Sequence, residues 1–89
     1  MVSFKYMNNK HRKTLDRLLT KPALKNIKFS DIDNLLIAIG LVRSEGSGSR
    51  IVFRFGDAFI VLHKPHPNNE VKTYVIKQLQ NFLKDIGVK

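Results

Sequence analysis

The sequence predicts an α+β protein in which a three-stranded antiparallel sheet has helices packed on one face. Two segments, 49–55 and 58–63, alternate between apolar and polar residues, as half-buried strands do. Other segments, before and after these strands, place apolar residues three and four positions apart, as amphipathic helices do. Because an antiparallel sheet of this size needs one covered face, we expect the helices to cover it.

The elements are expected in the order helix, helix, strand, strand, strand, helix. A short first helix spans Lys10 to Thr20 and ends before Pro22, which cannot continue it. The second helix runs from Ser30 to Gly40. Ser30 begins a sequence that resembles a capping box and is expected to be the N-cap, whereas Gly40 is expected at the C′ position.

The three strands are expected at 41–45, 49–55 and 58–63. The first two are joined by a turn at Gly46-Ser47-Gly48, and the last two by a two-residue hairpin turn at Gly56-Asp57. The last helix is expected to begin near Asn68 or Asn69 and to be capped by Gly87.

Composition and charge describe a small, strongly basic chain. It has 89 residues, the size of one domain, and 16 Lys and Arg against 7 Asp and Glu give a net charge of +9. Such a charge attracts polyanions, of which nucleic acid is the commonest. Eight Lys and Arg and one Asp fall within residues 1–28. We expect residues 1–29 to be a basic N-terminal extension with a short helix, and residues 30–89 to be the α+β domain, within one compact unit.

Several function classes are excluded by the same composition. The absence of Cys excludes disulfides and thiolate metal sites, and the three His are not spaced as metal ligands. No cofactor and no metal are therefore expected. Neither a secretory leader nor an apolar run long enough to span a membrane is recognised, so a cytoplasmic location without a membrane partner is expected.

The hairpin turn also predicts which side chains lie side by side. A two-residue turn places Arg50 opposite His63 and Arg54 opposite Phe59. One face is wholly apolar and is expected to be the core: Ile51, Phe53, Phe55, Ala58, Ile60 and Leu62. The other, uncovered face carries Arg50, Val52, Arg54, Phe59, Val61 and His63. Arg can grip a phosphate and His can move a proton near neutral pH, although such a face can also carry ordinary solubilising charges.

Three motifs, in their order and spacing, resemble one known family. They are Gly48-Ser49-Arg50-Ile51-Val52-Phe53, then Lys64-Pro65-His66-Pro67, and the closing helix Glu70–Asp85 with Ile86-Gly87-Val88 after it. The helix from Ser30 to Gly40 also matches. Together, over Ser30–Val88, they resemble the HicA family of bacterial toxin–antitoxin systems.

The resemblance implies a fold similar to double-stranded RNA-binding domains, cleavage of mRNA, and silencing by a HicB-like antitoxin. It also reveals a departure from the family pattern. The catalytic residue of the family is the His of Gly-Ser-His on the second strand, and this sequence has Arg50 at that position.

Three hypotheses follow for a HicA-like toxin that acts on RNA. In the first, His63 is the base of a metal-free endoribonuclease, Arg50 holds the phosphate, and Lys64 or His66 assists. In the second, the protein binds RNA without cleaving it, and Arg50 and Arg54 clamp phosphates. In the third, the charge serves an acidic protein partner. The residues expected to contact RNA are Arg50, Arg54, Ser49, Lys64 and His66.

Overall fold

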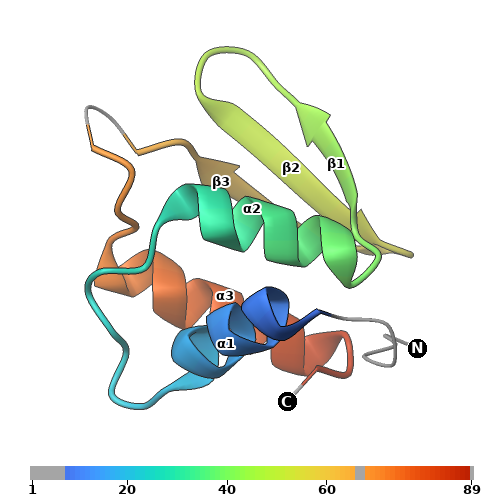
Figure 1. The fold of residues 1–89 in the computed structure, drawn as a ribbon. Helices are drawn as coiled ribbons and strands as arrows, with labels where there is room; N and C mark the ends of the chain where they lie inside the picture. Colours follow the sequence, from blue (N-terminus) through green and yellow to red (C-terminus); the bar gives the residue numbers. More distant parts are fainter. Residues whose placement is uncertain (1–7, 66–67, 89) are drawn as a thin grey trace.

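The computed structural model describes residues 8–65 and 68–88 and consists of three helices and a three-stranded antiparallel sheet (Figure 1). The elements are α1 (Asn9–Leu19), α2 (Phe29–Ala38), β1 (Val42–Glu45), β2 (Arg50–Phe55), β3 (Ala58–His63) and α3 (Thr73–Asp85). The predicted α+β class and element order are confirmed. Among the described residues, none of the helices is long and apolar enough to cross a membrane.

The sheet has the order β1-β2-β3, so β2 is central and the other two strands form its edges. The pairing of β2 with β3 places Arg50 opposite His63 and Arg54 opposite Phe59. This is the predicted register. It follows from the tight turn, where Gly56 has a φ of 61°, the left-handed conformation that a two-residue hairpin favours at its first position.

One face of the sheet is covered by α2 and α3 (Figure 1). The strand residues on this face are buried: Ile51, Phe53, Ile60 and Leu62, with Phe55 and Ala58 partly buried against them. The predicted core face is therefore confirmed. Helix residues that complete the core include Ile32, Leu35, Leu36, Ile76, Leu79 and Leu83.

Helix α1 packs against α2 and α3 and is tied to the core by Leu18, which is fully buried. Asn8 caps its start by accepting a hydrogen bond from the backbone N–H of His11 at 2.9 Å. At its end, the side-chain amide of Gln80 on α3 donates to the carbonyl oxygens of Leu18 and Thr20, at 2.9 and 3.1 Å. The short first helix was predicted, and these contacts hold it onto the other two.

The starts of two helices differ from the predictions. Helix α2 begins at Phe29 without a side-chain cap, so the prediction of Ser30 as its N-cap is wrong. The Ser30 hydroxyl instead accepts a hydrogen bond from the side-chain amide of Asn69 at 2.8 Å. Helix α3 begins at Thr73, so the prediction that it starts near Asn68 or Asn69 is also wrong.

The later start of α3 follows from an antiparallel bridge between Lys28 and Glu70, and the same contact engages the Ser30 hydroxyl, which accepts from Asn69 instead of capping a helix. The N–H of Phe29 donates to the carbonyl of Asn69 at 2.6 Å, and the N–H of Val71 donates to the carbonyl of Ile27 at 3.0 Å. These bonds hold both segments extended up to the helices. The predicted helix ends are confirmed, because Gly40 and Gly87 follow α2 and α3 with positive φ.

Candidate nucleic-acid interface

The face of the sheet turned away from α2 and α3 is called the open face. Strand alternation and the two registers give it three rows: Val42, Arg54 and Phe59; Ser44, Val52 and Val61; Gly46, Arg50 and His63. The last row includes Gly46 because its N–H donates to the carbonyl of Arg50 at 2.8 Å, one residue beyond β1. None of these nine described positions carries an acidic side chain. These nine positions therefore present positive charge to an approaching anion.

Arg50 and His63 form one corner of the open face. They are direct cross-strand partners, and both are exposed. The Cβ atoms of such partners lie about 5 Å apart. The predicted pairing is thus confirmed, whereas the catalytic roles of both residues stay predictions.

The charged end of Arg50 lies over Gly46. A Cβ atom added to Gly46 would come within 2.7 Å of the Arg50 Nε and within 3.2 Å of Nη2. Since β1 and β3 flank β2 on opposite sides, the guanidinium leans toward β1 and away from His63. The Arg50–His63 corner therefore presents a guanidinium on its β1 side and an imidazole on its β3 side.

Gly46 is a residue of the site that sequence reasoning missed. From the sequence it is only part of a turn, whereas in the structure its missing side chain makes room for Arg50. Its place becomes clear only once the register of β1 and β2 is known. Glu45 pairs with Ile51, and the next step of that register places Gly46 against Arg50.

The opposite end of the open face combines a cation with an aromatic ring. The guanidinium carbon of Arg54 lies 5.1 Å from the centre of the Phe59 ring, within the range of a cation–π contact. Phe59 is 56% exposed, and Val42 in the same row is 67% exposed. Nucleobases stack on such aromatic and guanidinium planes, so this row is a suitable surface for an unpaired base.

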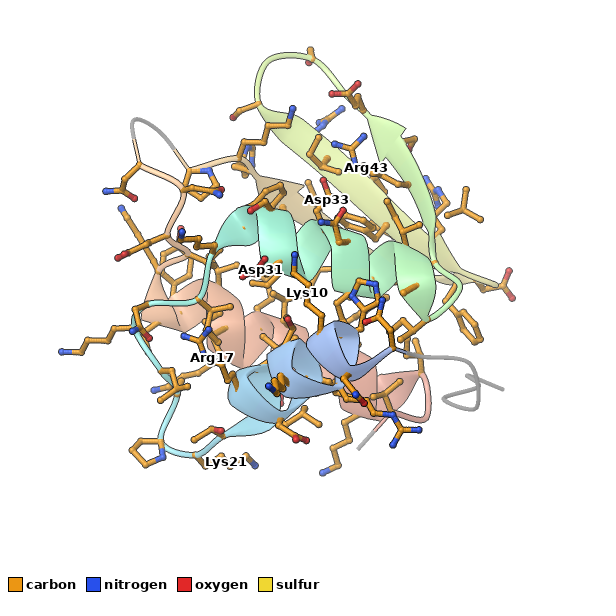
Figure 2. The ribbon with its side chains drawn as sticks, viewed as in Figure 1. Lys10, Arg17, Lys21, Asp31, Asp33 and Arg43 are labelled. Carbon is orange, nitrogen blue, oxygen red and sulfur yellow. The ribbon has the colours of Figure 1, made fainter. Side chains whose placement is uncertain are left out.

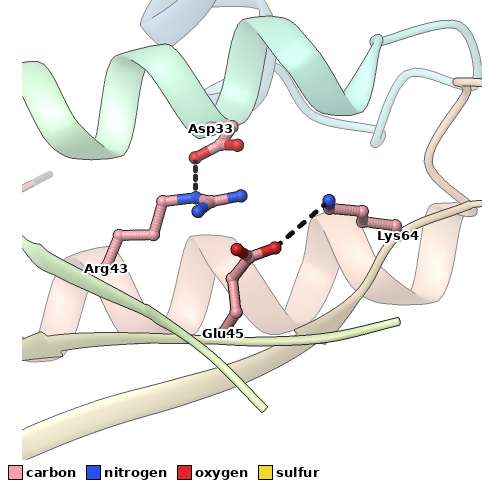
Figure 3. Close-up of polar contacts among 4 residues, drawn as sticks. All are labelled: Asp33, Arg43, Glu45 and Lys64. Carbon is pink, nitrogen blue, oxygen red and sulfur yellow. Dashed lines mark hydrogen bonds and ion pairs between the residues drawn. The ribbon is translucent and has the colours of Figure 1, made fainter. Parts of the chain in front are cut away.

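Lys64 lies on the other side of the sheet from this corner. It follows His63 by one residue, and alternation turns its side chain toward the α2 side, where its Nζ is 3.5 Å from Glu45 Oε1 (Figure 3). On the same side, Arg43 Nε donates to Asp33 Oδ1 at 2.9 Å and joins β1 to α2 (Figure 3). The structure therefore does not bring Lys64 to the Arg50–His63 corner.

Ser49 and His66 are the two remaining residues that were predicted to contact RNA. Ser49 is exposed in the turn before β2, and its carbonyl accepts the N–H of Lys64 at 2.9 Å, which extends the hairpin by one bond. Ser49 is thus next to the corner. His66 lies outside the described residues. Within residues 8–65 and 68–88, no three His, Asp or Glu side chains gather in a way that could hold a metal.

The basic residues of the N-terminal helix lie away from the open face. Figure 2 shows Lys10, Arg17 and Lys21 on and just after α1, on the side of α2 that is turned away from the sheet. Arg17 is committed to the fold, because its Nη2 donates to the backbone and side-chain oxygens of Asn26 at 3.3 and 3.2 Å. The basic residues of α1 therefore do not contribute to the Arg50–His63 corner.

These observations define a small basic α+β domain with an acid-free, cationic sheet face. The family model described as HicA toxin of bacterial toxin–antitoxin matches residues 29–88. The chain therefore belongs to the HicA toxin family, whose members are toxins of toxin–antitoxin systems and generally ribonucleases, with an antitoxin as partner. Comparison with curated proteins and with solved structures finds no match. Helix α1 precedes the matched region, and the expected division at residues 29 and 30 stays a prediction.

Proposed function

We propose that this chain is a toxin that binds mRNA on the open face and cleaves it at the Arg50–His63 corner without a metal ion. The observation that carries the proposal is the pairing of Arg50 with His63 on a face without acidic side chains. Membership of a family of ribonucleases supports the reaction type. The acid-free surroundings favour the approach of a phosphate backbone.

The proposed reaction is an attack of a ribose 2′-hydroxyl on the neighbouring phosphate. His63 takes the 2′-hydroxyl proton, a bond forms between the 2′-oxygen and phosphorus, and the bond from phosphorus to the 5′-oxygen breaks. The products are a 2′,3′-cyclic phosphate and a 5′-hydroxyl, whose oxygen takes up a proton from the imidazolium. We assign both proton transfers to His63 because, of the nine open-face positions, it alone has a side chain that exchanges protons near neutral pH.

In this reaction Arg50 supplies positive charge beside the phosphate. Its planar guanidinium can donate two parallel hydrogen bonds to phosphate oxygens and stabilise the charge that develops on the phosphorane. Arg50 occupies the position where the family resemblance expects the catalytic His. His63 is its direct partner on the neighbouring strand, so the proton-transfer group would be moved by one strand at the same end of the sheet.

The test is incubation of a long mRNA with the protein in EDTA, with analysis of the cleaved ends. We expect fragments that end in a 2′,3′-cyclic phosphate. His63→Ala should lower the cleavage rate by about 10²- to 10⁴-fold, the usual contribution of a general base. His11→Ala on α1 is the matched control and should cleave as the wild type does, because His11 lies far from the open face. A His63→Ala protein that cleaves at the wild-type rate would remove the proposal.

RNA binding without cleavage is a second candidate, and the orientation of Arg50 favours it. The guanidinium leans over Gly46, away from His63, as suits a phosphate clamp more than a partner in catalysis. Arg50 and Arg54 would then hold two phosphates at the two ends of β2. Intact RNA that is clearly retarded in a gel, with affinity that falls as salt rises, would support this candidate over the nuclease.

For the protein partner, we propose a HicB-like antitoxin, as family membership implies. The expected experiment is co-expression with the product of a neighbouring HicB-like gene, which should suppress RNA cleavage and growth arrest. A protein that has no more affinity for RNA than an uncharged control, but binds this acidic partner, would indicate that the open face serves protein interaction instead.

A further inference from the structure

A groove of about 490 Å³ lies at the outer edge of β3, between this strand, residues 64–65 and 68–72, and the first half of α3. Ligand pockets in proteins usually span about 300–1,000 Å³, so the groove has room for a nucleotide. We call it the edge groove. The ionisable and aromatic side chains that line it are Lys25, His63, Lys64, Glu70, Lys72 and Tyr74.

We propose that the edge groove holds an unstacked nucleotide of single-stranded RNA, next to the phosphate that is cleaved at the Arg50–His63 corner. This inference rests on the proposed function and names the form of RNA that the site accepts.

The groove is continuous with the corner through His63. This residue lies on the open face opposite Arg50 and also lines the groove. An RNA strand whose phosphate lies at the corner can therefore pass around the edge of β3 into the groove. Because β3 is an edge strand, no further strand of the described sheet blocks this path.

The chemistry of the reaction requires a nucleotide to leave the helical stack. Attack by the 2′-oxygen needs this oxygen, the phosphorus and the 5′-oxygen to be aligned, and a near-attack geometry must be held before the reaction. A stacked A-form duplex keeps its bases in place, whereas the bases of single strands can be splayed out and bound in pockets. The edge groove lies beside His63, the proposed general base, and is where such a nucleotide would be held.

The charges in the groove suit an anion. Lys25, Lys64 and Lys72 line it against one acidic residue, Glu70. The Nζ of Lys64 lies 3.5 Å from Oε1 of Glu45, and the two side chains are 48% and 62% exposed. This ion pair is therefore weak, and Lys64 remains able to attract another anion. Helix α3 also begins at the groove, with Lys72 at its N-cap position. It has no side-chain cap and no acidic residue in its first turn, so the positive end of its dipole adds to the charge of the lysines.

Tyr74 provides a surface for a base. It lies in the first turn of α3, lines the groove and is 67% exposed. Stacking on an aromatic side chain accepts any base, since every base has a flat face. A nucleotide combines a planar base with a phosphate, and it therefore fits an aromatic ring beside lysines better than an acidic peptide does.

The test uses a 12-nucleotide RNA of mixed sequence with 2′-fluoro ribose, which lacks the attacking hydroxyl and cannot be cleaved by this reaction. Its binding is measured by fluorescence anisotropy, both as a single strand and annealed to its complement. Tyr74→Ala should weaken binding of the single strand about 5- to 100-fold and leave binding of the duplex unchanged. Tyr74→Phe keeps the ring and should bind as the wild type does.

A second pair of variants tests the charge. Lys72→Ala should weaken single-strand binding and reduce the slope of log K against log salt by about 0.7, the loss of one phosphate contact. Lys77→Ala is the matched control, because Lys77 is an exposed residue of α3 that does not line the groove. Equal effects of the two substitutions would count against the groove.

The groove is overturned if Tyr74→Ala has no effect, or if it weakens single strand and duplex alike. It is also overturned by a peptide of alternating Glu and Ser that displaces the labelled RNA as effectively as unlabelled RNA does, if this displacement is lost in Tyr74→Ala. Because the probe is uncleavable, failure of the reaction is separable: a wild type that leaves mRNA intact but shows the Tyr74 effect loses the proposed reaction and keeps the groove. If the Tyr74→Ala protein instead cleaves mRNA normally and binds the single strand as the wild type does, the groove is lost and the proposed reaction is kept.

Discussion

The cations on the two sides of the sheet differ in whether a carboxylate lies near them. On the α2 side, Arg43 is bound to Asp33 at 2.9 Å and Lys64 lies 3.5 Å from Glu45 (Figure 3). On the open face, where Arg50 lies, none of the nine positions carries an acidic side chain. Each cation of the first side has a carboxylate partner within the fold, Arg43 at close range and Lys64 only weakly, whereas Arg50 remains for an anion from outside.

The difference teaches that net charge points to a kind of partner without locating the site. His63 and Lys64 are neighbours in sequence, yet one step along the strand puts them on opposite sides of the sheet. Helix α1 shows the same, because its Arg17 is bound to Asn26 and lies away from the open face. Where a cation lies relative to acidic residues decides whether it can hold a phosphate.

The largest expected effect compares two phenylalanines on opposite sides of the sheet. Phe53 is fully buried, and Phe59 is 56% exposed on the open face. Phe53→Ala should lower the free energy of unfolding by about 3–5 kcal/mol, since it leaves a cavity in the core. Phe59→Ala should lower it by less than about 1 kcal/mol and should weaken RNA binding, because a base and Arg54 lose their ring. Denaturant titration measures the free energy of unfolding, and fluorescence anisotropy measures the affinity for RNA.

If Phe53→Ala does not fold, Phe53→Leu keeps most of the volume and should cost less than about 1.5 kcal/mol. Similar destabilisation by the Phe53 and Phe59 substitutions would contradict the assignment of a covered face and an open face.

The next largest effect compares two cations near the same end of the sheet. Arg50→Ala should lower the rate of mRNA cleavage by about 10²- to 10³-fold, because it removes positive charge beside the phosphorane. Lys64→Ala removes a charge on the α2 side and should change the chemical step by less than about twofold. Single-turnover kinetics at saturating protein measure this step. Equal losses in the two variants would show that the side of the sheet does not govern the chemistry.

A smaller effect is expected from Gly46→Ala, which places a methyl group where the Arg50 guanidinium lies. The arginine must move, and we expect the cleavage rate to fall about tenfold, since small displacements of a positioning group are costly. Unfolding free energy should change little, because the displaced atoms belong to a flexible, exposed side chain. Ser44→Ala, on β1 and on the same face, is the control, and an equal fall in both variants would remove the role of Gly46.

The sequence was sufficient to predict the parts of the site that depend on short-range structure. The register of β2 and β3 depends on the two-residue turn at Gly56, so the pairing of Arg50 with His63 could be predicted. The turn between β1 and β2 is longer and allows several registers. For this reason the place of Gly46 beneath Arg50 could not be predicted.

Contacts between distant segments account for the other differences. The bridge from Lys28 to Glu70 joins residues far apart in sequence, delays the start of α3 and places Asn69 beside Ser30. No local pattern at Ser30 reports it, because the same residues are also suitable for a helix cap. The edge groove arises in the same way, since β3 and α3 meet only when the chain is folded.

The smallest expected effect separates the two ion pairs of the α2 side. The side chains of Arg43 and Asp33 are 25% and 18% exposed, whereas those of Lys64 and Glu45 are 48% and 62% exposed. Asp33→Asn should lower the unfolding free energy by about 1 kcal/mol, because a partly buried guanidinium loses its charged acceptor. Glu45→Gln should have almost no effect, as for most exposed pairs. RNA affinity should remain near the wild-type value in both, since neither carboxylate lies on the open face.

The two variants also differ in how they respond to salt. At about 1 M salt the Debye length falls to about 3 Å, so the exposed pair is screened and the wild type and Glu45→Gln should have equal stability. The partly buried pair is screened less, and a deficit of Asp33→Asn should persist in urea titrations at that salt concentration. If Asp33→Asn instead strengthens RNA binding severalfold, Arg43 would be released for phosphate contact. The α2 side would then join the interface, and the distinction between the two sides of the sheet would no longer hold.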